Sequence, residues 1–89
     1  MAYAIVRDVD LAETETADTA EWQARAKGLL KAELKRRNVT YAQLVERLAA
    51  IGVKETEPNI RNKIARGGFT AVFLLQVMVA VGAKEVRLD

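Results

Sequence analysis

The residues best suited to recognise another molecule lie in one short stretch of this 89-residue chain, the sequence TEPNIRNKIARG from Thr56 to Gly67. Ile60 and Ile64 stand one helical turn apart, so a helix over this stretch would bury a narrow apolar seam. The positions around them carry basic or amide groups: Asn59, Arg61, Asn62, Lys63 and Arg66. Asn can form two hydrogen bonds with an adenine edge, and Arg two with a guanine edge. The stretch is therefore typical of a helix that lies in the major groove of double-stranded DNA.

The candidate DNA contacts fall into two groups. From their spacing we predict that four residues share the face opposite the isoleucines and meet the bases, with Asn62 and Lys63 as the main readers; the four are Asn59, Asn62, Lys63 and Arg66. Arg61 lies to one side and is predicted to meet phosphate. The other predicted phosphate contacts lie upstream and are Lys31, Lys35, Arg36, Arg37 and Thr40. Arg36 and Arg37 have a second interpretation, because cations at a helix end also stabilise the helix dipole.

Two carboxylates oppose this interpretation. Glu55 and Glu57 stand at the start of the basic stretch, where they would repel phosphate unless Glu57 accepts a hydrogen bond from a cytosine amino group. They can equally complement the positive end of the helix dipole. A solvated helix face without a ligand is thus the structural alternative to DNA binding.

Charge is distributed unevenly along the chain. Residues 1–21 hold one basic residue against six acidic ones, a balance of −5, whereas residues 22–89 hold 13 basic against six acidic residues, a balance of +7. The positive charge of residues 22–89 is what we expect if their surface neutralises phosphates. The chain has no cysteine and no histidine, so thiolate and imidazole chemistry are excluded. We expect no enzyme, no cofactor, no metal site and no small-molecule substrate.

Length and hydropathy predict one soluble, cytoplasmic domain. The N-terminus lacks the basic start and apolar run of a signal peptide, and no segment has the ~18 to 20 unbroken apolar residues of a membrane span. We divide the chain into residues 1–17, an N-terminal strand with an acidic linker, and residues 18–89, a helical domain that ends in a strand. The strands are predicted over AYAIVRDV (residues 2–9) and EVRL (residues 85–88), paired within one chain or between two.

Helical spacing and capping residues predict four helices between the strands. The first begins near Asp18 or Thr19 and ends before Asn38; its core stripe is Trp22, Ala26, Leu29, Leu30 and Leu34. Thr40, Thr56 and Thr70 are the predicted caps of the next three. The stripe of the second is Tyr41, Leu44, Val45, Leu48 and Ile51, and Val53 is predicted to plug the core after the stop at Gly52.

The last predicted helix, AVFLLQVMVAV, is apolar except for Gln76. A helix that is apolar on all sides is normally buried on all sides, which a chain of this length achieves only with difficulty. Part of Phe73, Val77, Met78 or Val81 is therefore predicted to face another subunit, and we expect a homodimer.

Residues 30–82 resemble the helix-turn-helix domain of the phage repressors, the lambda-repressor-like or XRE type. The resemblance rests on LKAELKRRNVTYAQLVERLA, on IRNKIARG at the end of the second motif helix, and on the core helix FTAVFLLQVMVAVGA. Ile64, Arg66 and Gly67 match the family at the end of the second motif helix. One departure is the connection AAIGVKETEPN, which is longer than the tight turn of that family. The segment from Trp22 to Leu88 is also similar to a group of bacterial proteins defined as the domain of unknown function 6471.

The first resemblance implies a mainly α fold with four to five helices and a transcriptional regulator that binds double-stranded DNA through its second motif helix. The second implies a fold but no activity. A protein-interaction or antitoxin-like module, which reads no DNA, is the alternative function.

Overall fold

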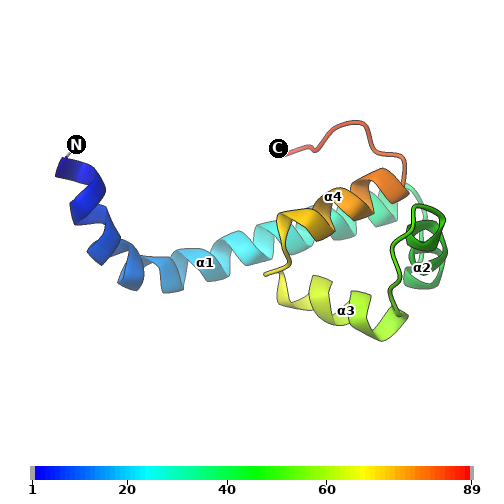
Figure 1. Ribbon diagram of the computed structural model, residues 1–89, viewed down its shortest axis with the longest axis horizontal. Coiled ribbons are helices and arrows are strands. Elements are labelled where there is room, and N and C mark those ends of the chain that lie inside the picture. Colours follow the sequence, from blue (N-terminus) through cyan, green and yellow to red (C-terminus); the bar gives the residue numbers. More distant parts are fainter. Residues whose placement is uncertain (1, 89) are drawn as a thin grey trace.

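In a computed structural model, residues 2–88 form four helices and no β-strand, and side chains are described from Thr19 to Leu88 (Figure 1). The helices are α1 (Ala2–Arg36), α2 (Tyr41–Ala50), α3 (Glu57–Arg66) and α4 (Ala71–Ala80). The prediction of a mainly α-helical chain is confirmed.

Threonine caps fix the starts of α2, α3 and α4, as predicted. The hydroxyl oxygens of Thr40, Thr56 and Thr70 each accept the backbone N–H three residues later, at 3.1, 3.3 and 3.1 Å. Each threonine has an extended backbone, so the chain enters the helix from a β-like conformation. These bonds satisfy one of the N–H groups that every helix start leaves without an internal partner.

Residues with positive φ end the helices. Asn38 (φ 61°) follows α1, and Gly52 (φ 87°) follows α2. In both turns the next residue bonds backward: the N–H of Val39 donates to the carbonyl of Leu34, and that of Val53 to Leu48, each at 2.9 Å. Val39 is thereby buried, and Val53 packs against the core from the turn, as predicted.

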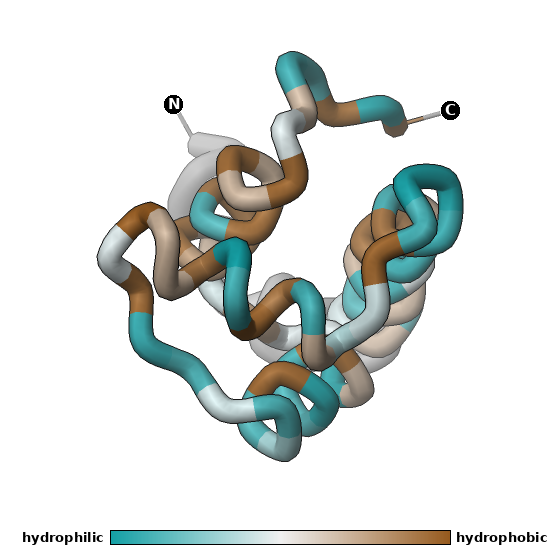
Figure 2. Tube along the Cα trace, turned by 90° about the vertical axis from the view of Figure 1, so that its right-hand side faces the viewer, coloured by the Kyte–Doolittle hydropathy of each residue, from teal (hydrophilic) through white to brown (hydrophobic). Residues whose placement is uncertain are grey.

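The core forms where α2 contacts both α3 and α4 while α3 contacts α1. Figure 1 looks along α2, whereas α3 lies across the view, so the two helices cross rather than run side by side. Figure 2 shows α1 on one side of the molecule and α4 with the C-terminal segment on the other. The buried apolar side chains are Leu30, Leu34, Val39, Leu44, Leu48, Ile60, Ile64, Phe73, Val77, Met78 and Val81.

Both predicted strands are corrected. Residues 2–9 and the predicted acidic linker, residues 10–17, belong to α1, which begins at Ala2 rather than near Asp18. Residues 85–88 have no regular secondary structure. A single strand leaves its backbone N–H and C=O groups unpaired, whereas a helix pairs them within the segment. Because residues 85–88 form no second strand, a helix is the conformation that pairs the backbone N–H and C=O groups of residues 2–9.

Two residues of the predicted stripes lie outside the core. Trp22 is 61% exposed and Ile51 is 43% exposed. Gln23 stands seven residues, or two turns, before the fully buried Leu30, so Gln23 rather than Trp22 continues the inward stripe of α1. Ile51 is the C-cap residue that follows α2, where the chain turns away toward Gly52.

The prediction for α4 is wrong in its residues. Phe73, Val77, Met78 and Val81, which were expected to reach a second subunit, are buried in the core. The side chains that α4 leaves exposed are instead Val72, Leu75 and Val79, at 62%, 59% and 61%. They recur at helical spacing and form one outward apolar stripe. No helix of the described residues is long and apolar enough to cross a membrane.

Candidate nucleic-acid interface

Helix α3 is held in place at both ends and on one face. Pro58 lies in its first turn, where the missing N–H of proline removes no hydrogen bond. Gly67 ends it with a φ of 71° and donates its N–H to the carbonyl of Ile64 (3.1 Å). Ile60 and Ile64 are fully buried, as the spacing predicted. The orientation of α3 about its own axis is therefore set by its contacts with the core.

Three of the four predicted base-facing residues lie together on the outward face of α3. Asn59, Asn62 and Arg66 are exposed and follow one another at spacings of three and four, so their side chains share one face. This face offers two amides and one guanidinium. Those are the groups that form bidentate hydrogen bonds with base edges in the major groove.

Lys63, the fourth predicted reader, lies on the flank of α3 that borders the core. Its ammonium Nζ is 2.5 Å from Glu55 Oε2 and 4.9 Å from the centre of the Phe73 ring. The Glu55 side chain is only 10% exposed, and Phe73 belongs to the core. The predicted position of Lys63 opposite the isoleucines is thus corrected: three residues after Ile60, it stands beside the seam rather than across from it.

Arg61 is also engaged locally. Its guanidinium bonds Glu57 at 2.9 Å, one turn earlier, and lies 5.5 Å from the centre of the Tyr41 ring on α2. The two glutamates that opposed DNA binding are therefore paired, Glu55 with Lys63 and Glu57 with Arg61. These pairs neutralise two of the three cations of α3 and leave Arg66 as its unpaired charge among the described residues.

Lys31 and Lys35, two of the predicted phosphate contacts, are exposed on α1. Lys31 lies away from a groove that Arg25, Leu29 and Arg36 line, whereas Lys35 stands seven residues after Gly28, which also lines that groove. Leu74 of α4 lines the groove, and none of its described lining residues belongs to α3; in Figure 2, α4 and α3 lie on different sides of α2. Both lysines are thus exposed on the helix that packs against α3.

The hydroxyl of Thr40, another predicted phosphate contact, is occupied within a reciprocal cap. It accepts the N–H of Gln43 (3.1 Å), while the Thr40 N–H donates to the Gln43 side-chain oxygen (2.9 Å). Thr40 itself is exposed in the loop between α1 and α2. Its principal local interaction is the start of α2.

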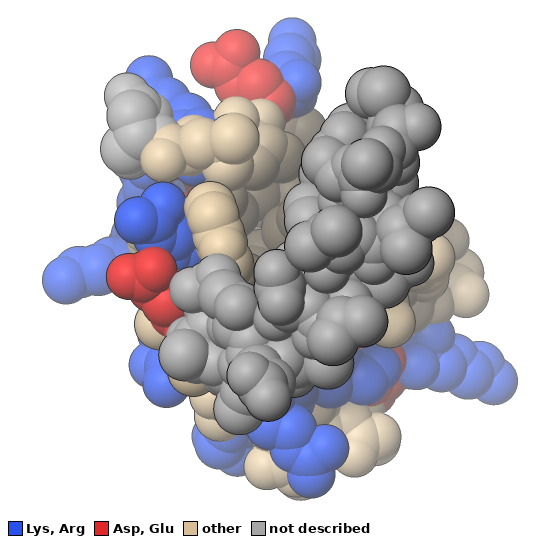
Figure 3. Space-filling model, turned by 90° about the vertical axis from the view of Figure 1, so that its left-hand side faces the viewer, with Lys and Arg blue, Asp and Glu red and all other residues tan. Residues whose placement is uncertain are grey.

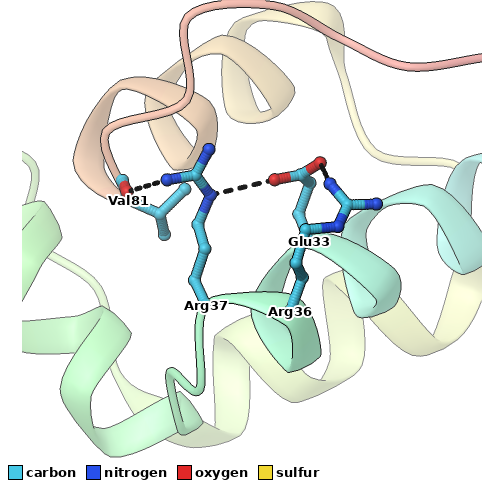
Figure 4. Close-up of polar contacts among 4 residues, drawn as sticks. All are labelled: Glu33, Arg36, Arg37 and Val81. Atoms are coloured by element: carbon cyan, nitrogen blue, oxygen red, sulfur yellow. Dashed lines mark hydrogen bonds and ion pairs between the residues drawn. The ribbon is translucent and has the colours of Figure 1, made fainter.

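Arg36 and Arg37, the remaining predicted phosphate contacts, both bond a residue of α1 that the sequence reasoning missed. That partner is Glu33, which is 3% exposed and bonds both guanidinium groups (Figure 4). Arg37 Nε lies 3.0 Å from Glu33 Oε1, and Arg37 Nη1 donates to the carbonyl of Val81 at 3.1 Å. Arg37 thus joins the end of α1 to the end of α4.

The same network sets the ionisation of Glu33. Hydrogen bonding to Arg37 lowers the pKa of this carboxyl from its ordinary value of 4.5, and burial opposes that change without cancelling it. Glu33 therefore remains charged in the folded state, where the two arginines compensate its burial. The signal was present in the sequence as an acid three and four residues before two arginines, the spacing of helical ion pairs.

The chain belongs to a family defined as a domain of unknown function, DUF6471, whose model matches residues 22–86. The predicted similarity to that group is confirmed. No curated protein matches the chain. No solved structure matches it either.

Proposed function

We propose that this domain is a transcriptional regulator of the phage-repressor type that binds double-stranded DNA with the outward face of α3. The observation that carries the proposal is the joint exposure of Asn59, Asn62 and Arg66 on a helix whose other face is fixed by two buried isoleucines. In this proposal α2 and α3 are the two motif helices, and α3 enters the major groove.

The cations outside α3 supply the phosphate contacts. Lys31 and Lys35 are exposed on α1, which packs against α3, and in this proposal they contact the phosphate backbone on one flank of the DNA groove. The resemblance of residues 30–82 to the phage repressors gives the same assignment of helices. Because Arg66 is the one cation of α3 that forms no ion pair with a described residue, most of the electrostatic affinity must come from these neighbouring lysines.

A polarisation titration tests the proposal. The full chain is titrated into a labelled random duplex at two salt concentrations, and we expect binding that weakens steeply as salt rises. The double variant Lys31→Ala/Lys35→Ala should lower the log-log salt slope by about two units, since each phosphate-contacting cation contributes about one. Lys84→Ala is the matched control, because Lys84 is an exposed cation beyond α4. Folded protein that fails to bind at low salt would contradict the proposal, as would equal effects of the control.

A protein-interaction or antitoxin-like module is the second candidate. The apolar surface left by Trp22 and by the outward stripe of α4 favours it, because exposed apolar patches mark interaction sites. A module of this kind predicts that Arg66→Ala and the lysine double variant leave every measured interaction unchanged. The two candidates are distinguished by the same titration.

A further inference from the structure

An apolar groove runs along the side of α1 that faces α4. Its volume is about 860 Å³, and its apolar lining includes Trp22, Ala26, Leu29, Leu74, Val86 and Leu88. Leu88 is 88% exposed and Trp22 61% exposed, so large apolar side chains at the groove meet solvent. Pockets of roughly 300 to 1,000 Å³ with apolar walls are the usual sites of ligand and partner side chains.

The groove is rimmed by cations. Arg25, Arg36 and Arg87 line it, and its one acidic residue, Glu33, is already paired with Arg36 and Arg37. Arg25 lies 4.7 Å from the centre of the Trp22 ring, at the edge of the apolar surface. Neither Arg25 nor Arg87 forms an ion pair with any other residue that the structure describes. Figure 3 shows uncharged surface beside Lys and Arg side chains on this end of the molecule. The groove therefore suits an apolar segment with acidic flanks.

The chain itself contains a segment of that kind. Residues 1–21 carry one basic and six acidic residues, and residues 2–17 are helical. The sequence of residues 2–17, AYAIVRDVDLAETETA, combines apolar residues such as Ile5 and Val9 with the acids Asp8, Asp10, Glu13 and Glu15. This segment lies outside the residues that match the family.

The segment cannot fill the groove of its own chain while α1 is continuous. Ala2 and Trp22 belong to the same helix, and a rise of 1.5 Å per residue puts them roughly 30 Å apart along it. The segment thus continues the line of α1 past the groove instead of returning to it. A second copy has no such restriction.

We infer that two copies of the chain associate reciprocally, each placing the acidic helical segment of residues 2–17 in the arginine-rimmed groove of the other. Apolar contact with Trp22 and Leu29 supplies affinity, and the rim arginines select the acidic segment. The inference is independent of DNA binding. It predicts a closed dimer with two equivalent contacts, because the exchange is mutual.

A charge exchange between full-length variants tests it by sedimentation equilibrium. Variant one, Arg25→Glu/Arg87→Glu, reverses the rim; variant two, Glu13→Lys/Glu15→Lys, reverses the segment. Each variant alone would place like charges together, and its dissociation constant should rise at least about tenfold over the unaltered chain. In an equimolar mixture, both contacts pair opposite charges again, so a mixed dimer should form with affinity near that of the unaltered chain. Circular dichroism confirms that each variant is folded.

A monomeric unaltered chain at the highest concentration overturns the inference, as do variants that dimerise undiminished or a mixture that fails to regain association. Val79→Glu is the companion variant, because Val79 lies on the outward stripe of α4. It should leave association unchanged. Loss of the dimer in Val79→Glu, with no effect of the charge exchange, would assign the contact to α4 instead.

Discussion

Gly67 lies directly against the backbone of α1 at Gln23. A Cβ atom built on Gly67 would stand 2.2 Å from the carbonyl oxygen of Gln23, far inside van der Waals contact. The same glycine ends α3 with a φ of 71°. One residue therefore sets both where the candidate DNA-binding helix stops and how closely that helix approaches α1.

Gly67→Ala should destabilise the domain by more than about 2 kcal/mol, since it adds a backbone clash to the roughly 1 to 2 kcal/mol cost of a left-handed non-glycine residue. Urea unfolding measures the loss. Gly52→Ala is the matched control: its φ is 87°, but nothing lies within 4 Å of the added Cβ. It should show the conformational cost alone. Equal losses in the two variants would mean that the contact with Gln23 is unimportant.

Removal of the carboxylate of Glu33 should make stability less dependent on acid pH. The folded pKa of Glu33 lies below 4.5, so its contribution is complete above that value and is lost as pH falls through the folded pKa. The free energy of unfolding of Glu33→Gln should thus be lower than that of the unaltered chain at pH 7. The difference should shrink below pH 4.5. Glu46→Gln, on the exposed surface of α2, should show no such difference at either pH. A gap that stays constant would contradict the assignment.

Arg37→Ala should cost roughly 1 to 3 kcal/mol, because it removes a hydrogen bond to the Val81 carbonyl and one of the two cations that compensate a buried carboxylate. The expected loss of stability is modest because the Arg37 side chain is 35% exposed and Arg36 still bonds Glu33. Thermal or urea unfolding measures it. Lys35→Ala, a neighbouring exposed cation, provides the comparison and should change stability by less than about 0.5 kcal/mol.

Arg66 and Lys63 should contribute unequally to DNA binding. Arg66 is exposed and forms no ion pair with another described residue, so Arg66→Ala is expected to weaken binding by roughly 1 to 3 kcal/mol through the loss of a base contact. Lys63 already bonds Glu55, and Lys63→Ala should have the smaller effect on affinity. Polarisation titrations of the two variants over a salt series decide the point. A larger effect of Lys63→Ala would restore its predicted role as a reader.

Trp22, the chain's one tryptophan, reports on the groove. In dilute protein its indole is exposed, so acrylamide should quench its fluorescence efficiently. Association of a second copy should shield the ring and shift its emission to shorter wavelength as concentration rises. The variant Glu13→Lys/Glu15→Lys should lack this concentration dependence. An emission maximum that is constant for the unaltered chain while sedimentation shows a dimer would place the dimer contact elsewhere.

The ends of the short helices and the inward side of α3 followed from the sequence alone. Thr40, Thr56 and Thr70 act on N–H groups three residues away, and glycine or asparagine stops act within one turn. Ile60 and Ile64 needed only helical periodicity. Interactions of this range are complete within a few residues, so the local sequence contains all the information that they require.

Only the tertiary structure could decide the features that depend on distant neighbours. Trp22 is exposed because Gln23 meets the end of α3, and Lys63 turns toward Glu55 and Phe73 on other elements. Arg37 reaches a carbonyl 44 residues away. Residues 2–9 are helical because residues 85–88 supply no second strand. The sequence determined which residues are suited to the core and which are suited to binding. The packing of α1 with α3 and α4 determined which of these residues are buried and which are exposed. Helical periodicity could not decide this, because it does not locate the atoms of the other helices.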